Sequence, residues 1–209
     1  MGTLQRQLSD GIAQLGLSVT EQQEQLLLDY LALLDKWNKA INLTAVRDIN
    51  EMVSRHLLDS LSIQQHLTGT RFMDVGTGAG LPGIPMAILN PEQEWWLVDT
   101  NSKKTRFLSQ AVHELGLNNV VVQHTRVESL QNADNFDGIV SRAFSSLSQM
   151  VNLTRHLLKP QGHFYAMKGV YPEEELLAIK TETKLIEVKP LHVPGCDGER
   201  HLAILTLAA

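Results

Sequence analysis

The stretch FMDVGTGAGLPG, from Phe72 to Gly83, is the part of the chain that decides the fold. Its first four residues have the apolar character of a buried strand end, and four of the next eight residues are glycines. In open sheets of parallel strands, a ligand binds where a strand runs into such a turn. Glycine is needed at Gly76 and Gly78 because a side chain there would keep a ligand away from the backbone. The stretch therefore predicts a cofactor site in preference to a turn without a ligand.

The identity of that cofactor depends on the residues around the glycines. Gly78, Gly80 and Gly83 satisfy the G-x-G-x-x-G spacing of dinucleotide sites, so the glycines alone leave an NAD-dependent oxidoreductase open. Asp74 before the first glycine and Pro82 within the turn favour S-adenosylmethionine. A dinucleotide needs a free helix N-terminus for its pyrophosphate, whereas S-adenosylmethionine has no phosphate and carries cationic groups that a carboxylate attracts. We therefore expect an S-adenosylmethionine-dependent methyltransferase.

A second acid, Asp99, ends the next apolar run, Glu94–Asp99, about twenty residues beyond the glycines. A carboxylate at this spacing can accept hydrogen bonds from both ribose hydroxyls of either cofactor. The competing interpretation is that Asp99 caps the helix that follows it, because aspartate is common at that position. We expect Asp99 to bind the cofactor.

Outward from the turn, short apolar runs alternate with helical stretches from residue 71 to the end of the chain. This alternation predicts an α/β protein with a Rossmann-like, mostly parallel sheet and helices on both faces, as in class I methyltransferases. No helix fits between the last two strands, so an antiparallel final strand is expected. The predicted strands are Arg71–Val75, Glu94–Asp99, Asn119–Gln123, Phe136–Ser141, Gly162–Met167, Lys184–Lys189 and His201–Leu207, and the predicted helices are Ile84–Leu89, Ser102–Leu115, Leu147–Leu158 and Pro172–Lys180.

The first third of the chain has the three- and four-residue apolar spacing of amphipathic helices, over Leu4–Leu15, Glu21–Lys39 and Glu51–Leu67. Thr20 with Gln23 predicts a capping box, and Asn50 a cap for the third helix. We therefore expect an N-terminal helical subdomain over residues 1–69 and a methyltransferase domain over residues 70–209.

Composition excludes several classes of protein. Cys196 is the only cysteine, so neither an intrachain disulfide nor a four-thiolate zinc site can form. His192, Cys196 and His201 lack a fourth ligand nearby, and we expect no metal site. The short, interrupted apolar runs contain neither a transmembrane span nor the apolar core of a signal peptide, which predicts a cytoplasmic protein.

Five motifs occur along the chain in a fixed order: KWNKAINLT (36–44), RHLLDS (55–60), the glycine-rich turn (74–83), SRAF (141–144) and GERHL (198–202). Together they span almost the whole sequence and resemble the bacterial 16S rRNA (guanine-N(7))-methyltransferases, the glucose-inhibited division protein B family. The resemblance implies methyl transfer from S-adenosylmethionine to nitrogen 7 of a guanine in 16S rRNA. A small-molecule methyltransferase and a ribosome-assembly factor that binds the cofactor without catalysis remain alternatives.

The same resemblance implies a set of cofactor contacts, to which the residues themselves add Gly78 and Asp99, with Asp74 completing the pocket. For Glu128 the competing interpretation is a solvated acid at a helix start. The contacts implied by the resemblance are Gly76, Leu81, Val127, Glu128 and Arg142.

Arg142 is also the candidate catalytic residue, because it closes the fourth strand at the edge where substrates enter. Its guanidinium can contact a guanine edge, a phosphate or a carboxylate. A structural ion pair with an acid such as Asp137 is the competing interpretation.

The predicted reaction needs no general base, because guanine nitrogen 7 has a free lone pair and no proton to lose. The formal charge of -5 argues against non-specific coating of RNA, so we expect a monomer that acts on a small-subunit ribosomal particle and contacts RNA locally. The candidate basic contacts are Lys103, Lys104 and Arg106, with Lys36, Lys39, Arg47, Arg55 and Arg200 as further ones.

Overall fold

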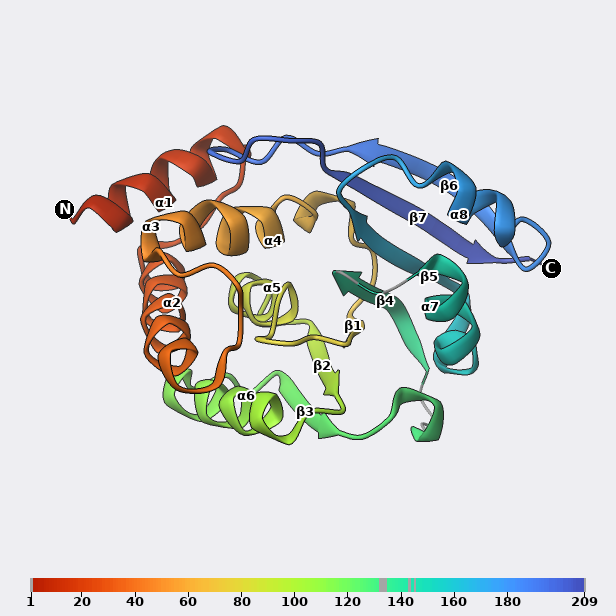
Figure 1. Cartoon of the computed structure of the whole chain (residues 1–209), viewed down its shortest axis with the longest axis horizontal. Helices are drawn as coiled ribbons and strands as arrows, with labels where there is room; N and C mark the ends of the chain where they lie inside the picture. The colour runs from red at the N-terminus through yellow and green to blue at the C-terminus, as the bar shows by residue number, and fades with distance from the viewer. Residues whose placement is uncertain (1, 132–134, 143, 145, 209) are drawn as a thin grey trace.

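The computed structural model describes residues 2–131, 135–142, 144 and 146–208, which fold around one mixed β-sheet (Figure 1). Its strand order, β3-β2-β1-β4-β5-β7-β6, and parallel pairing from β3 to β5 confirm the Rossmann-like α/β fold. β7 runs antiparallel to both neighbours, as expected from the missing helix before it. The strands are β1 (Arg71–Val75), β2 (Glu94–Asp99), β3 (Val120–His124), β4 (Phe136–Arg142), β5 (Leu158–Lys168), β6 (Thr183–Pro190) and β7 (His201–Leu207).

The glycine-rich turn leaves the sheet at the point where the direction of winding reverses. β1 pairs with β2 on one side, where Val75 lies opposite Val98, and with β4 on the other, where Asp74 lies opposite Val140. The carboxyl ends of these three parallel strands therefore meet at one edge of the sheet. Such a switch point is where open α/β sheets bind their ligands.

Helices cover both faces of the sheet, with α1 to α6 on one side and α7 and α8 on the other (Figure 1). Each side has its own buried apolar cluster, one including Leu27, Trp95 and Phe107 and the other Met73, Met150 and Phe164. The helices are α1 (Thr3–Gln14), α2 (Glu21–Ile41), α3 (Ile49–Met52), α4 (Asp59–Leu61), α5 (Gly83–Leu89), α6 (Ser102–Leu115), α7 (Leu147–Thr154) and α8 (Glu173–Ala178), with shorter turns η1 (Val53–Leu58), η2 (Gln64–His66), η3 (Val127–Ser129) and η4 (Arg155–Leu157).

The N-terminal helices share a core with the sheet. α2 packs against α5 and α6, and the Phe107 ring of α6 lies 6.4 Å from Tyr30 and 5.8 Å from Trp37, centroid to centroid. The fully buried Tyr30 hydroxyl donates a 2.8 Å hydrogen bond to the carbonyl of Ala79 in the glycine-rich turn. The N-terminal segment thus supports the turn directly, and a separate subdomain over residues 1–69 stays a prediction.

The third predicted helix, Glu51–Leu67, is broken into four short pieces. The second piece, η1, is a π-helix, and the segment ends in the 3₁₀ turn η2. A wider π turn changes the direction of the side chains that follow it, and such turns are frequent at functional sites. It buries His56, and Asp59, the next residue beyond the turn, is also buried. The RHLLDS motif coincides with this irregular helix.

Two capping predictions for these helices have opposite outcomes. The capping box of α2 is confirmed, because the Gln23 amide donates to Thr20 Oγ1 at 3.2 Å and the Thr20 amide donates to Gln23 Oε1 at 3.0 Å. The predicted Asn50 cap is wrong. Asp48 caps α3, because its side chain precedes the helix and accepts from the Asn50 amide at 2.9 Å.

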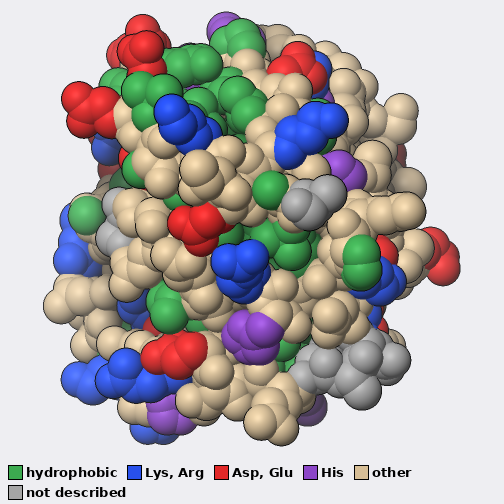
Figure 2. Space-filling view, turned by 90° about the vertical axis from the view of Figure 1, so that its right-hand side faces the viewer, with side chains coloured by type: hydrophobic (Ala, Val, Ile, Leu, Met, Phe, Trp, Pro, Cys, Tyr) green, Lys and Arg blue, Asp and Glu red, His purple; other side chains and the backbone are tan. Residues whose placement is uncertain are grey.

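The face seen from the side of α7 and α8 carries mixed charges without a continuous basic surface (Figure 2). Lysine and arginine side chains alternate there with acidic and uncharged ones, and hydrophobic side chains gather in the upper part of the view. Among the residues that the structure describes, the large apolar side chains exposed to solvent lie around α8 and the edge strand β6: Val170, Tyr171, Leu177, Leu185 and Ile186. In the described part of the chain, none of the helices combines the length and the hydropathy needed to cross a membrane.

Candidate functional site

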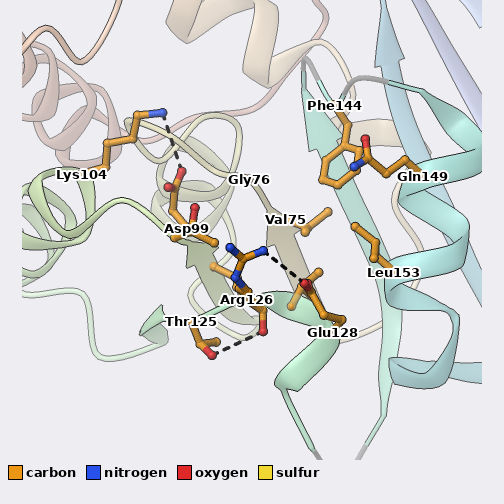
Figure 3. Close-up of a pocket in the computed structure, with 13 residues that line it drawn as sticks. Val75, Gly76, Asp99, Lys104, Thr125, Arg126, Glu128, Phe144, Gln149 and Leu153 are labelled. Carbon is orange, nitrogen blue, oxygen red and sulfur yellow. Dashed lines mark hydrogen bonds and ion pairs between the residues drawn. The ribbon is translucent and has the colours of Figure 1, made fainter.

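A cavity of about 450 Å³ lies at the carboxyl ends of β1 and β2 (Figure 3). Its volume is in the range of small-molecule sites, which span roughly 300–1,000 Å³. Four segments build it: the glycine-rich turn, the end of β2 with the start of α6, the turn at η3, and the segment after β4 with α7. The lining residues are Val75, Gly76, Val98, Asp99, Thr100, Lys104, Thr125, Arg126, Val127, Glu128, Phe144, Gln149 and Leu153.

The glycine-rich turn forms one wall of the cavity through its backbone. Gly76 and Gly78 have φ values of 66° and 62°, which residues other than glycine rarely adopt. The Gly76 amide donates to the Val98 carbonyl at 2.9 Å, which fixes the turn against β2. A Cβ at Gly76 would have the Phe144 ring, which also lines the cavity, as its nearest neighbour at 3.6 Å. A side chain at Gly76 would therefore occupy space that the cavity leaves for a ligand.

Asp74 lies behind this turn and does not line the cavity. It is fully buried, and its Oδ2 accepts from the Thr77 hydroxyl at 2.7 Å and from the Gly83 amide at 2.9 Å. The expectation that Asp74 completes the pocket is therefore wrong, because its carboxylate braces the turn from inside the core. Burial raises the pKa of Asp74 to about 7, although the two hydrogen bonds and the Arg142 charge lower it.

The position of Asp74 also bears on the choice of cofactor. The Gly83 amide is the first of α5, and a dinucleotide pyrophosphate would need such amides at the helix N-terminus. That amide already donates to the Asp74 carboxylate. An anionic pyrophosphate would lose this donor and lie close to another anion, so the geometry favours a ligand without phosphate.

Asp99 reaches the cavity from the end of β2 with both carboxylate oxygens partly engaged. Oδ2 accepts from the Gly78 amide at 3.0 Å and Oδ1 accepts from the Asn101 amide at 2.8 Å. Asn101 caps α6, since its Oδ1 accepts from the Lys103 amide at 3.0 Å, and the interpretation of Asp99 as that cap is wrong. Each carboxylate oxygen keeps acceptor capacity, so Asp99 can still bind a ribose diol.

Lys104 is the cation that faces Asp99 across the cavity mouth. Its Nζ lies 3.9 Å from Asp99 Oδ2, and its side chain is about one-third exposed at 34% (Figure 3). Lys104 therefore borders the cavity wall that Asp99 forms.

A further wall of the cavity comes from η3. Val127 is buried, while the Glu128 side chain is 43% exposed and lies 3.7 Å from Arg126 in an ion pair (Figure 3). Glu128 is thus both an acid in the first turn of a 3₁₀ helix and a lining residue of the cavity. The geometry accommodates both interpretations of this residue.

The structure brings four of the seven predicted cofactor residues to the cavity: Gly76, Asp99, Val127 and Glu128. Gly78 and Leu81 lie farther along the turn, where Leu81 is buried in the core, and Arg142 points to the face covered by the N-terminal helices. Contact of these three with a cofactor stays a prediction. Ala143, within the SRAF motif, lies outside the described residues.

Sequence reasoning gave no sign that several other residues line the cavity, among them Thr125, Gln149 and Leu153. Gln149 and Leu153 lie on α7, and Figure 3 shows them opposite Asp99 together with Phe144. Their four-residue spacing is a usable signal, since it places both side chains on one face of the helix. Which face of α7 turns toward the cavity depends on tertiary packing.

Arg142 forms an ion pair, although with a different acid from the one expected. Its Nη1 donates to Asp59 Oδ2 at 3.1 Å and to the Arg55 carbonyl at 3.0 Å. Asp137 is bonded instead to Lys159 at 2.6 Å. The partner predicted from sequence is therefore wrong, because the helical segment around Asp59 covers the end of β4.

His56 lies next to this ion pair and is buried in its neutral form. Its Nδ1 lies 2.9 Å from the Arg55 carbonyl and must donate to it, so its Nε2 accepts from the Thr44 hydroxyl at 2.8 Å. Burial, and then the Arg142 charge, lower the pKa of His56 to about 4. His56 therefore adds no charge near pH 7.

Comparisons with known proteins match most of the chain to one family. The sequence model of the family described as rRNA small subunit methyltransferase G matches residues 23–203. The Pseudomonas fluorescens ribosomal RNA small subunit methyltransferase G is 54% identical over 97% of this chain and 95% of its own. The Vibrio cholerae protein of the same name is 49% identical over 99% of both chains.

Solved structures of lower identity share the fold. An S-adenosylmethionine-dependent methyltransferase from Aquifex aeolicus superposes with a TM-score of 0.58 at 19% identity, covering 73% of this chain and 91% of that one. The glycopeptide N-methyltransferase MtfA, solved with S-adenosylmethionine, gives 0.63 at 8% identity, covering 74% and 88%. At such identities the likeness concerns the fold alone.

Proposed function

The chain belongs to the rRNA small subunit methyltransferase G family, and from this premise we propose that it methylates nitrogen 7 of a guanine in 16S rRNA, with S-adenosylmethionine as the donor. The observation that carries the proposal is the cavity beside Gly76, at the switch point of the sheet. At Gly76 no side chain separates the cavity from the backbone, so a ligand can lie directly against it. Behind this wall, the first amide of α5 already donates to the Asp74 carboxylate.

The lining residues fit the parts of this donor. Gly76 leaves room for the methionine portion, and the Asp99 carboxylate accepts hydrogen bonds from the ribose hydroxyls. Val127 and Glu128 border the adenine, and the other side combines the apolar Phe144 and Leu153 with the polar Gln149. Gly78, Leu81 and Arg142 complete our proposed set of cofactor contacts.

When bound, S-adenosylmethionine supplies an electrophilic methyl group. Nitrogen 7 of guanine would attack this methyl group with its lone pair as the methyl–sulfur bond breaks and S-adenosylhomocysteine leaves. The chain must therefore align the two reactants and exclude water, and it need not remove a proton. We place Arg142 at the reacting groups, since it ends β4 two residues before Phe144 in the cavity wall.

We propose a cytoplasmic monomer whose substrate is the small ribosomal particle. A net charge of -5, with interspersed charges on the face that Figure 2 shows, gives little non-specific attraction to naked RNA. A folded particle adds shape and protein contacts that free RNA lacks. Recognition by a few local contacts is compatible with this charge.

The experiment compares substrates under one set of conditions. Labelled S-adenosylmethionine is incubated with small subunits from cells that lack this enzyme, with bare 16S rRNA and with a metabolite extract, and digested rRNA is analysed for 7-methylguanosine. We expect label in 7-methylguanosine from the subunits. Label in metabolites only would favour a small-molecule methyltransferase, and binding to particles without transfer would favour an assembly factor. Tight NAD binding without S-adenosylmethionine binding, measured by calorimetry, would favour an oxidoreductase.

A further inference from the structure

Three segments distant in sequence meet at the carboxylate of Asp59. Oδ2 accepts from Arg142 Nη1 at 3.1 Å, and Oδ1 accepts from Arg200 Nε at 3.2 Å. The two arginines lie 83 and 141 residues along the chain from Asp59. Asp59 follows the π-helix η1, Arg142 ends β4, and Arg200 immediately precedes β7. The Asp59 side chain is only 7% exposed, so this contact is sheltered from water.

The cluster has more cationic than anionic groups. Two guanidinium groups face one carboxylate, and the neighbouring His56 is neutral near pH 7. Arg55, which is exposed, pairs with Glu51 at 3.4 Å and adds no further net charge. The contact at Asp59 therefore carries one positive charge in excess, on a chain whose net charge is -5.

Both arginines keep donors for a further anion. Arg200 uses Nε for Asp59 and Nη1 for the Glu199 carbonyl at 2.7 Å, and Arg142 uses Nη1 for its two acceptors. Within the described residues, Nη2 of each has no protein acceptor. Their side chains remain 30% and 24% exposed. A guanidinium offers five donors, so a half-used one can still bind an oxyanion.

The cluster lies beside the cofactor cavity without being part of it. None of Asp59, Arg142 and Arg200 lines the cavity, but Arg142 precedes Phe144 of the cavity wall by two residues. An anion held by Arg200 would therefore lie outside the cofactor site and next to it. A nucleotide entering that site brings such anions on either side, in the phosphates of its own strand.

We propose that Arg200 binds a phosphate of the target RNA strand beside the reacting guanine, and that Asp59 is the positioning residue that holds Arg200 and Arg142 in one arrangement. This inference rests on the proposed function and adds the place where the RNA backbone is held. Free arginine side chains lose much rotational freedom when they bind a phosphate. The buried carboxylate of Asp59 restricts that freedom before the RNA arrives.

The first test removes the phosphate contact. Binding of small subunits to Arg200→Gln is measured at several salt concentrations, with Arg155→Gln as the matched control. Arg155 also forms an arginine–carboxylate pair, with Glu182 at 3.4 Å, but lies on η4 near the opposite end of β4. We expect the slope of log K against log salt to fall by about 0.7–0.9 for Arg200→Gln, as for one lost phosphate contact, and to stay unchanged for the control. Affinity for S-adenosylmethionine should stay unchanged in both variants.

The second test removes the positioning residue while keeping its size. In Asp59→Asn both arginines retain their charge, so the salt slope should not fall, whereas kcat should drop on the order of tenfold through lost alignment. Thermal melting is recorded, and kcat is measured well below the melting temperature. The double variant Asp59→Asn/Arg200→Gln should lose less than the sum of the single effects, because the two residues act together.

Three results would overturn the proposal. The first is a salt slope of Arg200→Gln equal to that of Arg155→Gln, and the second is a weakened affinity for S-adenosylmethionine in Arg200→Gln, which would place the cofactor carboxylate there. The third is an Asp59→Asn variant that melts earlier with unchanged kcat, which would make Asp59 merely structural. Wild-type protein that binds subunits without methylating them would refute the proposed function instead, and the slope comparison could still be made.

Discussion

Replacing Gly76 by leucine separates the role of this residue in ligand binding from its role in the backbone. Gly76 has a φ of 66°, and a residue with a Cβ in this conformation costs about 1–2 kcal/mol. A change of 1 kcal/mol shifts the melting temperature of a chain of this size by roughly 2–4 °C. We therefore expect Gly76→Leu to fold and to melt a few degrees below wild type.

The effect on the ligand should be much larger than the effect on folding. The new side chain would start 3.6 Å from Phe144 and extend into a cavity of about 450 Å³. Because the donor must lie against this backbone, we expect its affinity to fall at least about 100-fold, or about 2.7 kcal/mol. Isothermal titration calorimetry measures the affinity, and scanning calorimetry measures the stability.

Gly116→Leu is the matched control. Gly116 ends α6 with a φ of 65°, and a Cβ there would meet nothing within 4 Å. The backbone strain is therefore the same, and the residue does not line the cavity. Comparable melting and a cofactor affinity in Gly76→Leu within threefold of that in Gly116→Leu would refute the placement of the ligand.

Three further predictions concern acids and a tyrosine around the turn. Asp99→Asn should weaken S-adenosylmethionine binding about tenfold in calorimetry, since hydrogen bonds to a charged acceptor are worth about 1 kcal/mol more than neutral ones; unchanged binding would contradict it. Tyr30→Phe should lower the free energy of unfolding in urea by about 1–3 kcal/mol, because the Ala79 carbonyl loses its partner, and a loss below about 0.5 kcal/mol would not fit. Asp74 has a pKa raised to about 7, so folding favours its protonated form. As the pH rises from 4 to 7, the wild type should therefore lose up to about 1.4 kcal/mol of folding free energy per pH unit relative to Asp74→Asn. Equal dependence of stability on pH in the two proteins would refute this.

The sheet could be predicted from sequence because buried parallel strands are continuous apolar runs between turn residues. The bounds of β1, β2 and β7 match their predictions. β5 begins at Leu158, four residues before the predicted start, because Leu158 pairs with Phe136 while the polar residues after it are partly or fully exposed. This part of the strand was not predicted because the residues that follow Leu158 are polar and include a proline.

The π-helix η1 could not be predicted from apolar spacing. Residues 51–67 keep the periodicity of an ordinary helix, whereas the structure has a wider turn at η1, and His56 within it and Asp59 just after it are buried against polar partners. Those partners, Thr44 and Arg142, come from other segments. The sequence of residues 51–67 alone therefore does not predict this packing.

The same distinction applies to the site. The places of Gly76 and Asp99 in the cavity wall were predictable because they follow from spacing within one strand–turn–strand unit. The acid that pairs with Arg142 was not, since Asp59 comes 83 residues earlier and is brought to β4 only by the N-terminal helices. Asp74 lies next to the glycine-rich turn as predicted, but its side chain faces the core and not the cavity. Spacing along the sequence does not tell which of the two a carboxylate faces.

A crystal structure with bound S-adenosylhomocysteine, the demethylated donor, tests the central claim most directly. We predict electron density in the cavity, with the sulfur beside Gly76, the ribose hydroxyls within hydrogen-bond distance of Asp99, and the adenine against Val127 and Glu128. Density at another site, or a cavity beside Gly76 closed by the protein's own side chains in the presence of saturating ligand, would contradict the account.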